Sequence, residues 1–254
     1  MTKPSTRPCG EYIRAGDASD VLVVGNLAGR YTLLERAVRW ADLAGRPKRH
    51  LILQAAMGRG GTANCRTLGT IAELRATWGK RVHFLPGRID TAFATDYPCH
   101  DRDRRLVNEQ WKVELLRDYG DCWRSEFDRL RRFVLDAPLA YSVFENVIVC
   151  STPPDHRWVD EYGRLFDLSM TDDDFAEPRL AFAFVWGGGY DRRDALRFRE
   201  ASGAKLLVHG AMLRCPVHRD GDDRIMLGNE DSRIGCALIH PTSLNADTCE
   251  TFAL

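Results

Sequence analysis

Three apolar segments of this chain each run into a glycine-containing turn, and two of the turns lead directly into an amphipathic helix. The segments are DVLVVGN (20–26), HLILQAAM (50–57) and RVHFLPGR (81–88). Helices are predicted over 31–45 and 67–79, where apolar residues recur at helical spacing. Strands that alternate with helices over short connections predict an α/β fold with the sheet buried between layers. Because ligands of such sheets bind at the carboxyl ends of strands, we expect the chemistry of this protein at the three turns.

The middle of the chain is predicted to be helical over 106–135, with two aromatic stripes that we interpret as core. The first stripe consists of Trp111, Leu115, Leu116 and Tyr119, and the second of Trp123, Phe127, Leu130 and Val134. The segment 137–154 alternates apolar and polar residues, which predicts a hairpin that turns at Glu145 and Asn146. An acidic loop (171–179), a short helix (195–202) and strands within 205–212, 223–231 and 236–243 complete the prediction.

Composition limits the classes of function. The chain has 254 residues, is 44% hydrophobic and shows no linker, so we predict an N-terminal extension (1–19) and a single domain (20–254). The 36 basic and 36 acidic residues balance, and we therefore expect no nucleic-acid partner. Arginine supplies 31 of the basic residues. This bias is explained by a GC-rich genome, which we favour, or by bidentate contacts at protein interfaces.

Cysteine usage and apolar runs bear on the compartment. The eight cysteines form no C-x-x-C pair, which predicts reduced thiols in an intracellular protein. No apolar run is long enough for a membrane span, and the first 20 residues lack a secretory signal. The cytoplasm is the expected compartment. Mitochondria are the alternative, because the first residues are basic and contain Ser and Thr, although Glu11 and Asp17 follow.

Five short motifs follow the predicted strands in a particular order. They are G-N-L-A-G (25–29), Q-A-A-M-G-R-G (54–60), G-R-I-D (87–90), S-T-P (151–153) and H-G-A-M (209–212). Their order and spacing resemble those of the calcineurin-like metallophosphoesterases, and most closely the phosphoprotein phosphatase family, which reads GDxHG, GDxVDRG, GNHE, HGG and a late His. The resemblance implies a four-layer α-β-β-α sandwich of two mixed sheets flanked by helices.

The same resemblance implies that the residues needed for catalysis are missing. The family binds two metal ions through carboxylate, imidazole and amide ligands. In this chain the ligand positions are taken by Asn26, Ala28, Ala55, Arg88, Ser151 and Ala211, and those of the general-acid pair by Gly58 and Ile89. Alanine offers no lone pair, and an arginine adds positive charge where two dications would lie. We therefore expect neither bound metal nor any other cofactor.

This pattern is typical of a pseudophosphatase, which keeps the scaffold without the reaction. The sequence predicts an inactive Ser/Thr phosphatase-like protein that serves as a structural or interaction subunit of a large protein assembly. A first alternative is a non-catalytic site for phosphate, a nucleotide or a phosphopeptide, lined by Asn26, Arg59, Arg88 and His209. Arg59 matches one phosphate-binding arginine of the family, and the other falls on Phe184. The simpler interpretation is that Arg59 and Arg88 pair with acids such as Asp90.

Two further alternatives concern relocated chemistry. A phosphoesterase with a rearranged metal site could use Asp90, His209 and Asp155. Thiol chemistry could use Cys150, but the apolar strand before it favours a buried, inert thiol. The glycines at 187–189 are not a phosphate loop, because no Lys-Ser/Thr and no long helix follow them.

Overall fold

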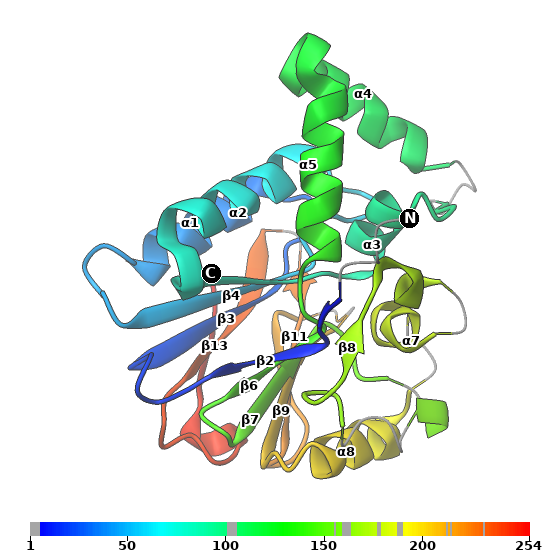
Figure 1. Cartoon of the computed structure of the whole chain (residues 1–254). Coiled ribbons are helices and arrows are strands. Elements are labelled where there is room, and N and C mark those ends of the chain that lie inside the picture. The colour runs from blue at the N-terminus through cyan, green and yellow to red at the C-terminus, as the bar shows by residue number, and fades with distance from the viewer. Residues whose placement is uncertain are drawn as a thin grey trace.

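The chain folds into two β-sheets that pack face to face between helices (Figure 1). The computed structural model describes residues 6–100, 106–154, 156–158, 164–176, 179–186, 190–211, 213, 215–230 and 232–254. The predicted site residue Asp155 and the glycines at 187–189 lie outside these ranges.

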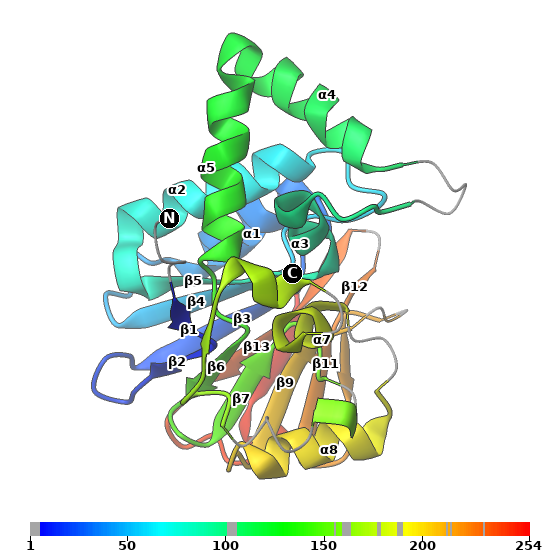
Figure 2. The same cartoon turned by 45° about the vertical axis from the view of Figure 1, so that its right-hand side comes forward.

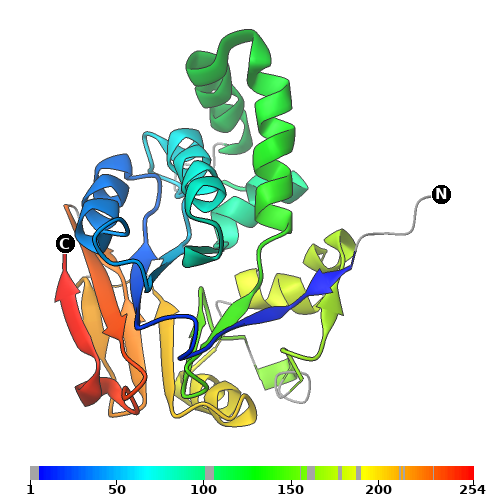
Figure 3. The same cartoon turned by 60° about the vertical axis from the view of Figure 1, so that its left-hand side comes forward.

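Each of the two large sheets has six strands in the described part of the chain, and the short strands β1 and β8 form a separate two-stranded sheet. The β7 sheet has the spatial order β10 (Val217–Arg219), β11 (Arg224–Leu227), β9 (Leu206–Gly210), β7 (Val147–Cys150), β6 (Ala140–Val143) and β2 (Gly10–Ile13). The β3 sheet has the order β12 (Asn229–Glu230), β13 (Arg233–Ile239), β3 (Asp20–Asn26), β4 (Arg49–Gln54) and β5 (Val82–Leu85), with β14 (Glu250–Ala253) paired to β13. The separate pair is β1 (Arg7–Pro8) and β8 (Ser169–Met170), antiparallel to each other (Figure 3).

The helices lie outside the two sheets. They are α1 (Tyr31–Ala41), α2 (Asn64–Trp78), α3 (Arg88–Thr95), α4 (Asn108–Tyr119), α5 (Trp123–Leu135), α7 (Leu180–Trp186) and α8 (Arg192–Ala201). Short 3-10 helices span Gly79–Arg81, Gly120–Cys122, His156–Trp158, Asp172–Phe175 and Ala246–Thr248. Figures 1 and 2 show α1 and α2 on one side of the two sheets and α8 on the other. No described helix has the length and apolar character that crossing a membrane requires.

The predicted four-layer sandwich of two mixed sheets is confirmed. β3, β4 and β5 are parallel and β13 is antiparallel to β3, while β9 is parallel to β7 and β6 is antiparallel to β7. Alternate residues along a strand point to opposite faces of its sheet. Accordingly, Val23 and Val149 are buried in the cluster between the sheets. Their neighbours Leu22 and Ile148 belong to a second buried cluster that includes helical residues such as Leu34.

The α4–α5 hairpin stands away from the sandwich (Figure 2) and confirms most of the predicted stripes. Trp111 and Leu115 are buried in α4, and Leu130 and Val134 are buried in α5. Leu116 is 55% exposed, so its placement in the core was wrong. The reason is helical geometry, because each residue is turned by about 100° from the one before it.

Several elements differ from the prediction. Helix α3 forms directly after the third strand, and α7 follows the acidic loop, although neither was predicted. Strand β2 lies within the predicted N-terminal extension and pairs with β6, so this segment adds an edge strand to the β7 sheet. The hairpin turns one residue earlier than predicted, because Phe144 and Glu145 both have positive φ (52° and 61°) and Asn146 N–H donates to Val143 O.

Candidate functional site

The three glycine-containing turns after β3, β4 and β5 stack on one another at one edge of the sandwich. These strands are parallel, so their carboxyl ends meet at the same edge. The N–H of Ala28 donates to Ala55 O at 3.1 Å, and the N–H of Ala55 donates to Leu85 O at 2.9 Å. The sequence-predicted positions in the first three motifs are therefore brought together by backbone hydrogen bonds.

The β7 sheet contributes its own strand ends to the same edge. Gln54 Nε2 donates to the carbonyl of Cys150 at 3.0 Å, and Ser151 Oγ donates to Leu85 O at 3.1 Å. A Cβ at Gly210 would lie 2.9 Å from Ser151 O, so the ends of β7 and β9 are also in contact. Ala211 continues from β9 and donates its N–H to the end of β11. The fourth and fifth motifs thus reach the edge that holds the first three.

Ala28 and Ala55 stand at two predicted ligand positions and have unusual backbone angles. Their φ values are 50° and 44°, in the left-handed region that Gly, Asn and Asp tolerate better than alanine. A Cβ at Gly58 would lie 2.6 Å from Ala28 Cβ, and one at Gly87 would lie 2.5 Å from Ala55 Cβ. The alanine methyl groups therefore contact the backbone of the neighbouring turns, and glycine is required at 58 and 87.

Asp90 is fully buried and serves as the cap of α3. Its carboxylate accepts the N–H of Gly87 at 2.7 Å and the N–H of Met57 at 2.9 Å. The first of these bonds satisfies a backbone N–H at the N-terminus of α3, and the second joins the β4 turn to α3. Burial raises the pKa of Asp90 to about 7, against the opposing effect of the backbone N–H donors. Both carboxylate oxygens are thus used in folding the turns.

His209 lies on the helix-covered face of the β7 sheet. Leu206 and Val208 belong to the cluster between the sheets, so strand alternation directs His209 to the opposite face. Its ring is completely buried, packs edge-on against Tyr190 and donates from Nδ1 to Gly210 O at 2.8 Å. Burial lowers the pKa of His209 to about 4. The ring is therefore neutral at pH 7, and its Nε2 has no hydrogen-bond partner among the described residues.

Arg59 and Arg88 reach solvent from adjacent turns. Arg88 is the first residue of α3, and its guanidinium lies over the ring of Trp186 at 4.5 Å from the ring centre. The pKa of Arg88 is lowered, first by partial burial and then by the positive charge of Arg59. In the described part of the chain, no carboxylate lies within 4.0 Å of either guanidinium. The described residues therefore contain no ion pair that would support the interpretation that both arginines pair with acids such as Asp90.

Asn26 and Gln54 end two neighbouring strands with polar side chains. The side-chain oxygens Asn26 Oδ1 and Gln54 Oε1 are buried, and no described residue donates a hydrogen bond to either. The backbone oxygen of Asn26 accepts from Asn229 Nδ2 at 2.6 Å. Sequence reasoning missed Gln54 and Trp186. A polar residue at the end of the apolar run HLILQ was the available signal for Gln54, whereas Trp186 is placed by tertiary packing alone.

Two other predicted positions have structural roles. Phe184, at the position of the second phosphate-binding arginine, is buried in α7 against Phe198, with ring centres 5.4 Å apart. Cys150 is buried at the end of β7, and burial raises the pKa of its thiol, which supports the inert interpretation. Ile89 is 8% exposed and packs in the core.

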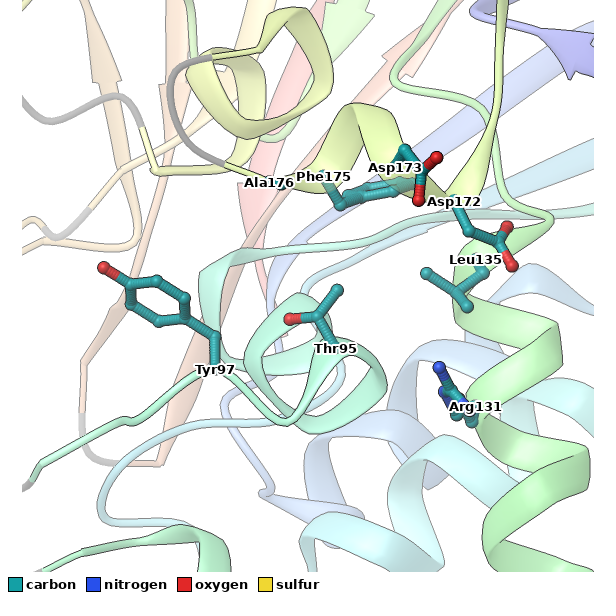
Figure 4. Close-up of a pocket in the computed structure, with 8 residues that line it drawn as sticks. All are labelled: Thr95, Tyr97, Arg131, Leu135, Asp172, Asp173, Phe175 and Ala176. Atoms are coloured by element: carbon teal, nitrogen blue, oxygen red, sulfur yellow. The ribbon is translucent and has the colours of Figure 1, made fainter.

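The residues at this edge do not suit a two-metal centre. The six ligand positions carry three methyl groups, an amide, a hydroxyl and a cation, and Asp90 is bonded to backbone N–H groups. No three His, Cys, Asp or Glu side chains within the described ranges come together as metal ligands. A separate cavity of about 290 Å³ lies at the other end of α3 (Figure 4). It is lined by Thr95, Tyr97, Arg131, Leu135, Asp172, Asp173, Phe175 and Ala176.

Solved structures that match this fold include three phosphatases. A Saccharomyces cerevisiae protein serine/threonine phosphatase with similarity to human phosphatase PP5 superposes with a TM-score of 0.68, at 13% identity over 96% of this chain and 83% of that chain. A putative diadenosine tetraphosphatase matches with a TM-score of 0.52, at 12% identity over 97% of each chain. A cold-active protein-tyrosine phosphatase of a Shewanella species matches with a TM-score of 0.57, at 11% identity over 96% of this chain and 82% of that chain.

Sequence comparison adds no closer relative. No protein-family model matches the chain, and no curated protein sequence matches it either. At identities of 13% and below, the likeness to solved structures establishes the fold and leaves the activity to the residues of the site.

Proposed function

Because the chain has the fold of the calcineurin-like metallophosphoesterases, we propose that it is a catalytically inactive Ser/Thr phosphatase-like protein. It acts as a structural or interaction subunit of a larger protein assembly. The proposal depends on the residues that stand at two metal-ligand positions, in the turns after β3 and β4. Ala28 and Ala55 occupy ligand positions and direct methyl groups at the backbone of Gly58 and Gly87.

The charge at the same edge supports this proposal. Metal-assisted phosphoester hydrolysis needs carboxylates that hold two dications and lower the pKa of a bridging water. Here Arg88 stands at a ligand position, and Arg59 is close enough to lower its pKa. Two guanidinium groups would repel dications, and no described carboxylate lies within 4.0 Å of either group.

The interaction role is supported by the α4–α5 hairpin. Val113 is 67% exposed and Leu116 is 55% exposed, and both lie on α4, away from the sandwich (Figure 2). Large apolar side chains that adjoin on a protruding helix are typical of protein contacts. Seven of the eight cysteines are buried or half-buried, and all eight are free, as an intracellular protein would have them.

A phosphoesterase with a rearranged metal site is the competing function. Two of its three candidate ligands are described. Asp90 accepts backbone N–H groups at the start of α3, and His209 lies on the helix-covered face of the β7 sheet, which is turned away from the β3 sheet. The test is hydrolysis of para-nitrophenyl phosphate by the purified chain with added Mn²⁺. We expect no turnover above the buffer rate. Turnover that disappears in Arg88→Ala or His209→Ala would overturn the proposal.

Membership of an assembly is tested by native gel electrophoresis of cell extracts. The wild-type chain should migrate only in a species much larger than the monomer. The variant Val113→Asp/Leu116→Asp should shift to the monomer position, because it places charges in the apolar contact. Gln110→Asp, also exposed on α4, is the matched control and should stay in the large species. A wild-type chain that migrates as a free monomer contradicts the subunit role.

A further inference from the structure

The cavity of about 290 Å³ lies between the end of α3, the helix α5 and the 3-10 helix Asp172–Phe175 (Figure 4). Arg88, at a metal-ligand position, is the first residue of α3, whereas Thr95, which lines the cavity, is the last. The cavity is therefore separate from the edge that holds the five motifs. Ligand sites usually have volumes of about 300–1,000 Å³, so this one is of a size for a small molecule.

The floor of the cavity is apolar. Leu135 and Phe175 line it, and only 1% and 2% of their surfaces are exposed. Tyr97 lines the cavity as well and is partly exposed, and its ring is held by Trp186 at 4.6 Å and by Phe182 at 5.8 Å between ring centres. An aliphatic group of a ligand would therefore be removed from water on a surface that is already packed.

Two carboxylates line the same cavity, and only one of them is neutralised by the fold. Asp172 accepts from Arg7 at 2.9 Å and from Arg132 at 3.3 Å, so both of its carboxylate oxygens are used. Asp173 is exposed, and its carboxylate has no hydrogen bond or ion pair with a described residue. The cavity thus carries one negative charge that is free to bind a ligand.

Arg131 is held at the cavity by one nitrogen and leaves the others free. Its Nε donates to Ala94 O, in the last turn of α3, at 2.7 Å. Its two Nη groups have no acceptor in the described part of the chain, and no described carboxylate lies within 4.0 Å of the guanidinium. Asp173 and Arg131 therefore line one cavity without pairing with each other. In the view of Figure 4, Asp173 lies above Leu135 and Arg131 below it.

We propose that this cavity binds a small zwitterion, an α-amino acid with an apolar side chain. Its carboxylate accepts hydrogen bonds from Arg131 Nη, its ammonium group donates to Asp173, and its side chain lies on Leu135 and Phe175. A ligand with one charge would leave either Asp173 or Arg131 unpaired, whereas a zwitterion forms charge-assisted hydrogen bonds with both. This inference does not depend on the proposed function, because neither charged residue lies at the edge that holds the five motifs.

Binding should also stabilise the fold, because the ligand connects separate segments of the chain. Asp172 already joins the 3-10 helix to β1 through Arg7 and to α5 through Arg132. A ligand that contacts Asp173 and Arg131 adds a second connection between the 3-10 helix and α5. A ligand that binds only the folded chain raises its Tm, and the rise grows with ligand concentration.

The test is equilibrium dialysis of radiolabelled L-leucine against the whole chain. The competitors are isoamylamine, which lacks the carboxylate, isocaproate, which lacks the ammonium group, and glycine, which lacks the side chain. We expect one L-leucine per chain with a Kd of about 1 mM. Each analogue should compete about tenfold more weakly than unlabelled L-leucine, or worse, because each lacks one of the three contacts.

Variants of the two charged residues locate the site. Asp173→Asn and Arg131→Gln should each weaken L-leucine binding about tenfold or more. Asp173→Asn should not weaken binding of isocaproate, and Arg131→Gln should not weaken binding of isoamylamine, because the missing charge has no partner on that analogue. Asp128→Asn and Arg124→Gln, exposed on α5 outside the cavity, are the matched controls and should bind L-leucine like the wild type.

Each contrary outcome has a definite meaning. The absence of saturable binding of L-leucine at about 10 mM overturns the inference as a whole. Competition by isocaproate or isoamylamine as strong as that by L-leucine overturns the choice of a zwitterion. Unchanged L-leucine binding in Asp173→Asn overturns the location, and this variant decides even if Arg131→Gln unfolds, because the Asp173 carboxylate makes no bond with a described residue. All of these results leave the inactive scaffold standing.

Discussion

At the amino ends of β3, β4 and β5, polar side chains form an ion pair and a hydrogen bond with one another. At the carboxyl ends of the same strands, the described residues form no such side-chain pair. Asp20 and Arg49 form a buried ion pair, and Arg49 also lies over Trp40. Beside them His50 Nδ1 and His83 Nε2 share a hydrogen bond of 2.9 Å between the sheets. Apart from His83 Nδ1, which has no hydrogen-bond partner among the described residues, these polar groups bond to one another inside the fold, as in a structural core.

The carboxyl edge holds polar groups that folding alone does not use. Arg59 and Arg88 are both exposed. The side-chain oxygens of Asn26 and Gln54 are buried without donors among the described residues. The two edges belong to the same sheet. We therefore attribute the difference to their roles, which are structural at the amino edge and functional at the carboxyl edge. Substitutions at the amino edge should therefore act on stability, and those at the carboxyl edge on binding.

The largest effect is expected from Arg49→Ala at the amino edge. This change leaves the Asp20 carboxylate buried without its partner and should lower the free energy of unfolding by about 3–5 kcal/mol. Urea denaturation followed by circular dichroism measures the loss. The double variant Asp20→Asn/Arg49→Met removes both charges and should recover much of it. A loss below about 1 kcal/mol in the single variant would show that the pair resembles a surface salt bridge.

The histidine pair predicts that acid destabilises the fold. Burial lowers the pKa of His50 and lowers that of His83 further, with Arg81 and Arg75 acting in the same direction. The unfolded chain therefore takes up protons below about pH 6.5 while the folded chain does not, so stability falls as the pH falls. We expect this pair to contribute a loss of about 2 kcal/mol or more between pH 7 and pH 5, taken as the difference between the wild type and a variant without the two histidines.

The control for that prediction is His50→Leu/His83→Leu. The slope of unfolding free energy against pH should be shallower in this double variant than in the wild type over the same range. Asp90 acts in the opposite direction, since its raised pKa stabilises the fold at low pH and this contribution is lost as the pH rises through about 7. Identical slopes in the wild type and the double variant would contradict a neutral, buried histidine pair.

At the carboxyl edge, a smaller effect of opposite sign is expected from Ala28→Gly and Ala55→Gly. Both alanines have positive φ, which costs an L-residue about 1 kcal/mol and glycine almost nothing. Each variant should gain about 0.5–1 kcal/mol of stability in urea denaturation. Ala37→Gly, in the interior of α1, is the matched control and should lose about 1 kcal/mol. Destabilisation by both turn variants would mean that the methyl contacts with Gly58 and Gly87 outweigh the backbone strain.

The smallest change in stability is expected from Arg88→Gln. Its side chain reaches solvent and has no ion pair with a described residue, so the free energy of unfolding should change by about 0.5 kcal/mol or less. The same urea series that includes Arg49→Ala measures it. A loss comparable with that of Arg49→Ala would remove the distinction between the two edges.

The order of β3, β4 and β5 and of their turns was predictable because each of these strands is an apolar run with a glycine at or shortly after its end. Helix α3 was not, because RIDTAFAT is short and its capping partner Asp90 bonds to Met57 of another turn. Strand β2 has four residues and gains its order from pairing with β6. Periodicity also could not decide that Leu115 is buried and Leu116 exposed, since both adjoin the same helical face.

The site was predictable in its residue types but not in their directions. Asn26, Arg59 and Arg88 could be placed at one edge because each follows a strand of a parallel set. His209 was grouped with them, yet strand alternation directs its side chain to the other face of the β7 sheet. The contact of Trp186 with Arg88 depends on where α7 packs, which no local pattern in the sequence specifies.

The proposal that this scaffold is inactive is tested most directly by elemental analysis of the purified chain after incubation with Mn²⁺ and gel filtration. Ala28, Ala55 and Arg88 at ligand positions predict that no metal remains in stoichiometric amount. Two metal ions per chain, retained through gel filtration, would contradict it.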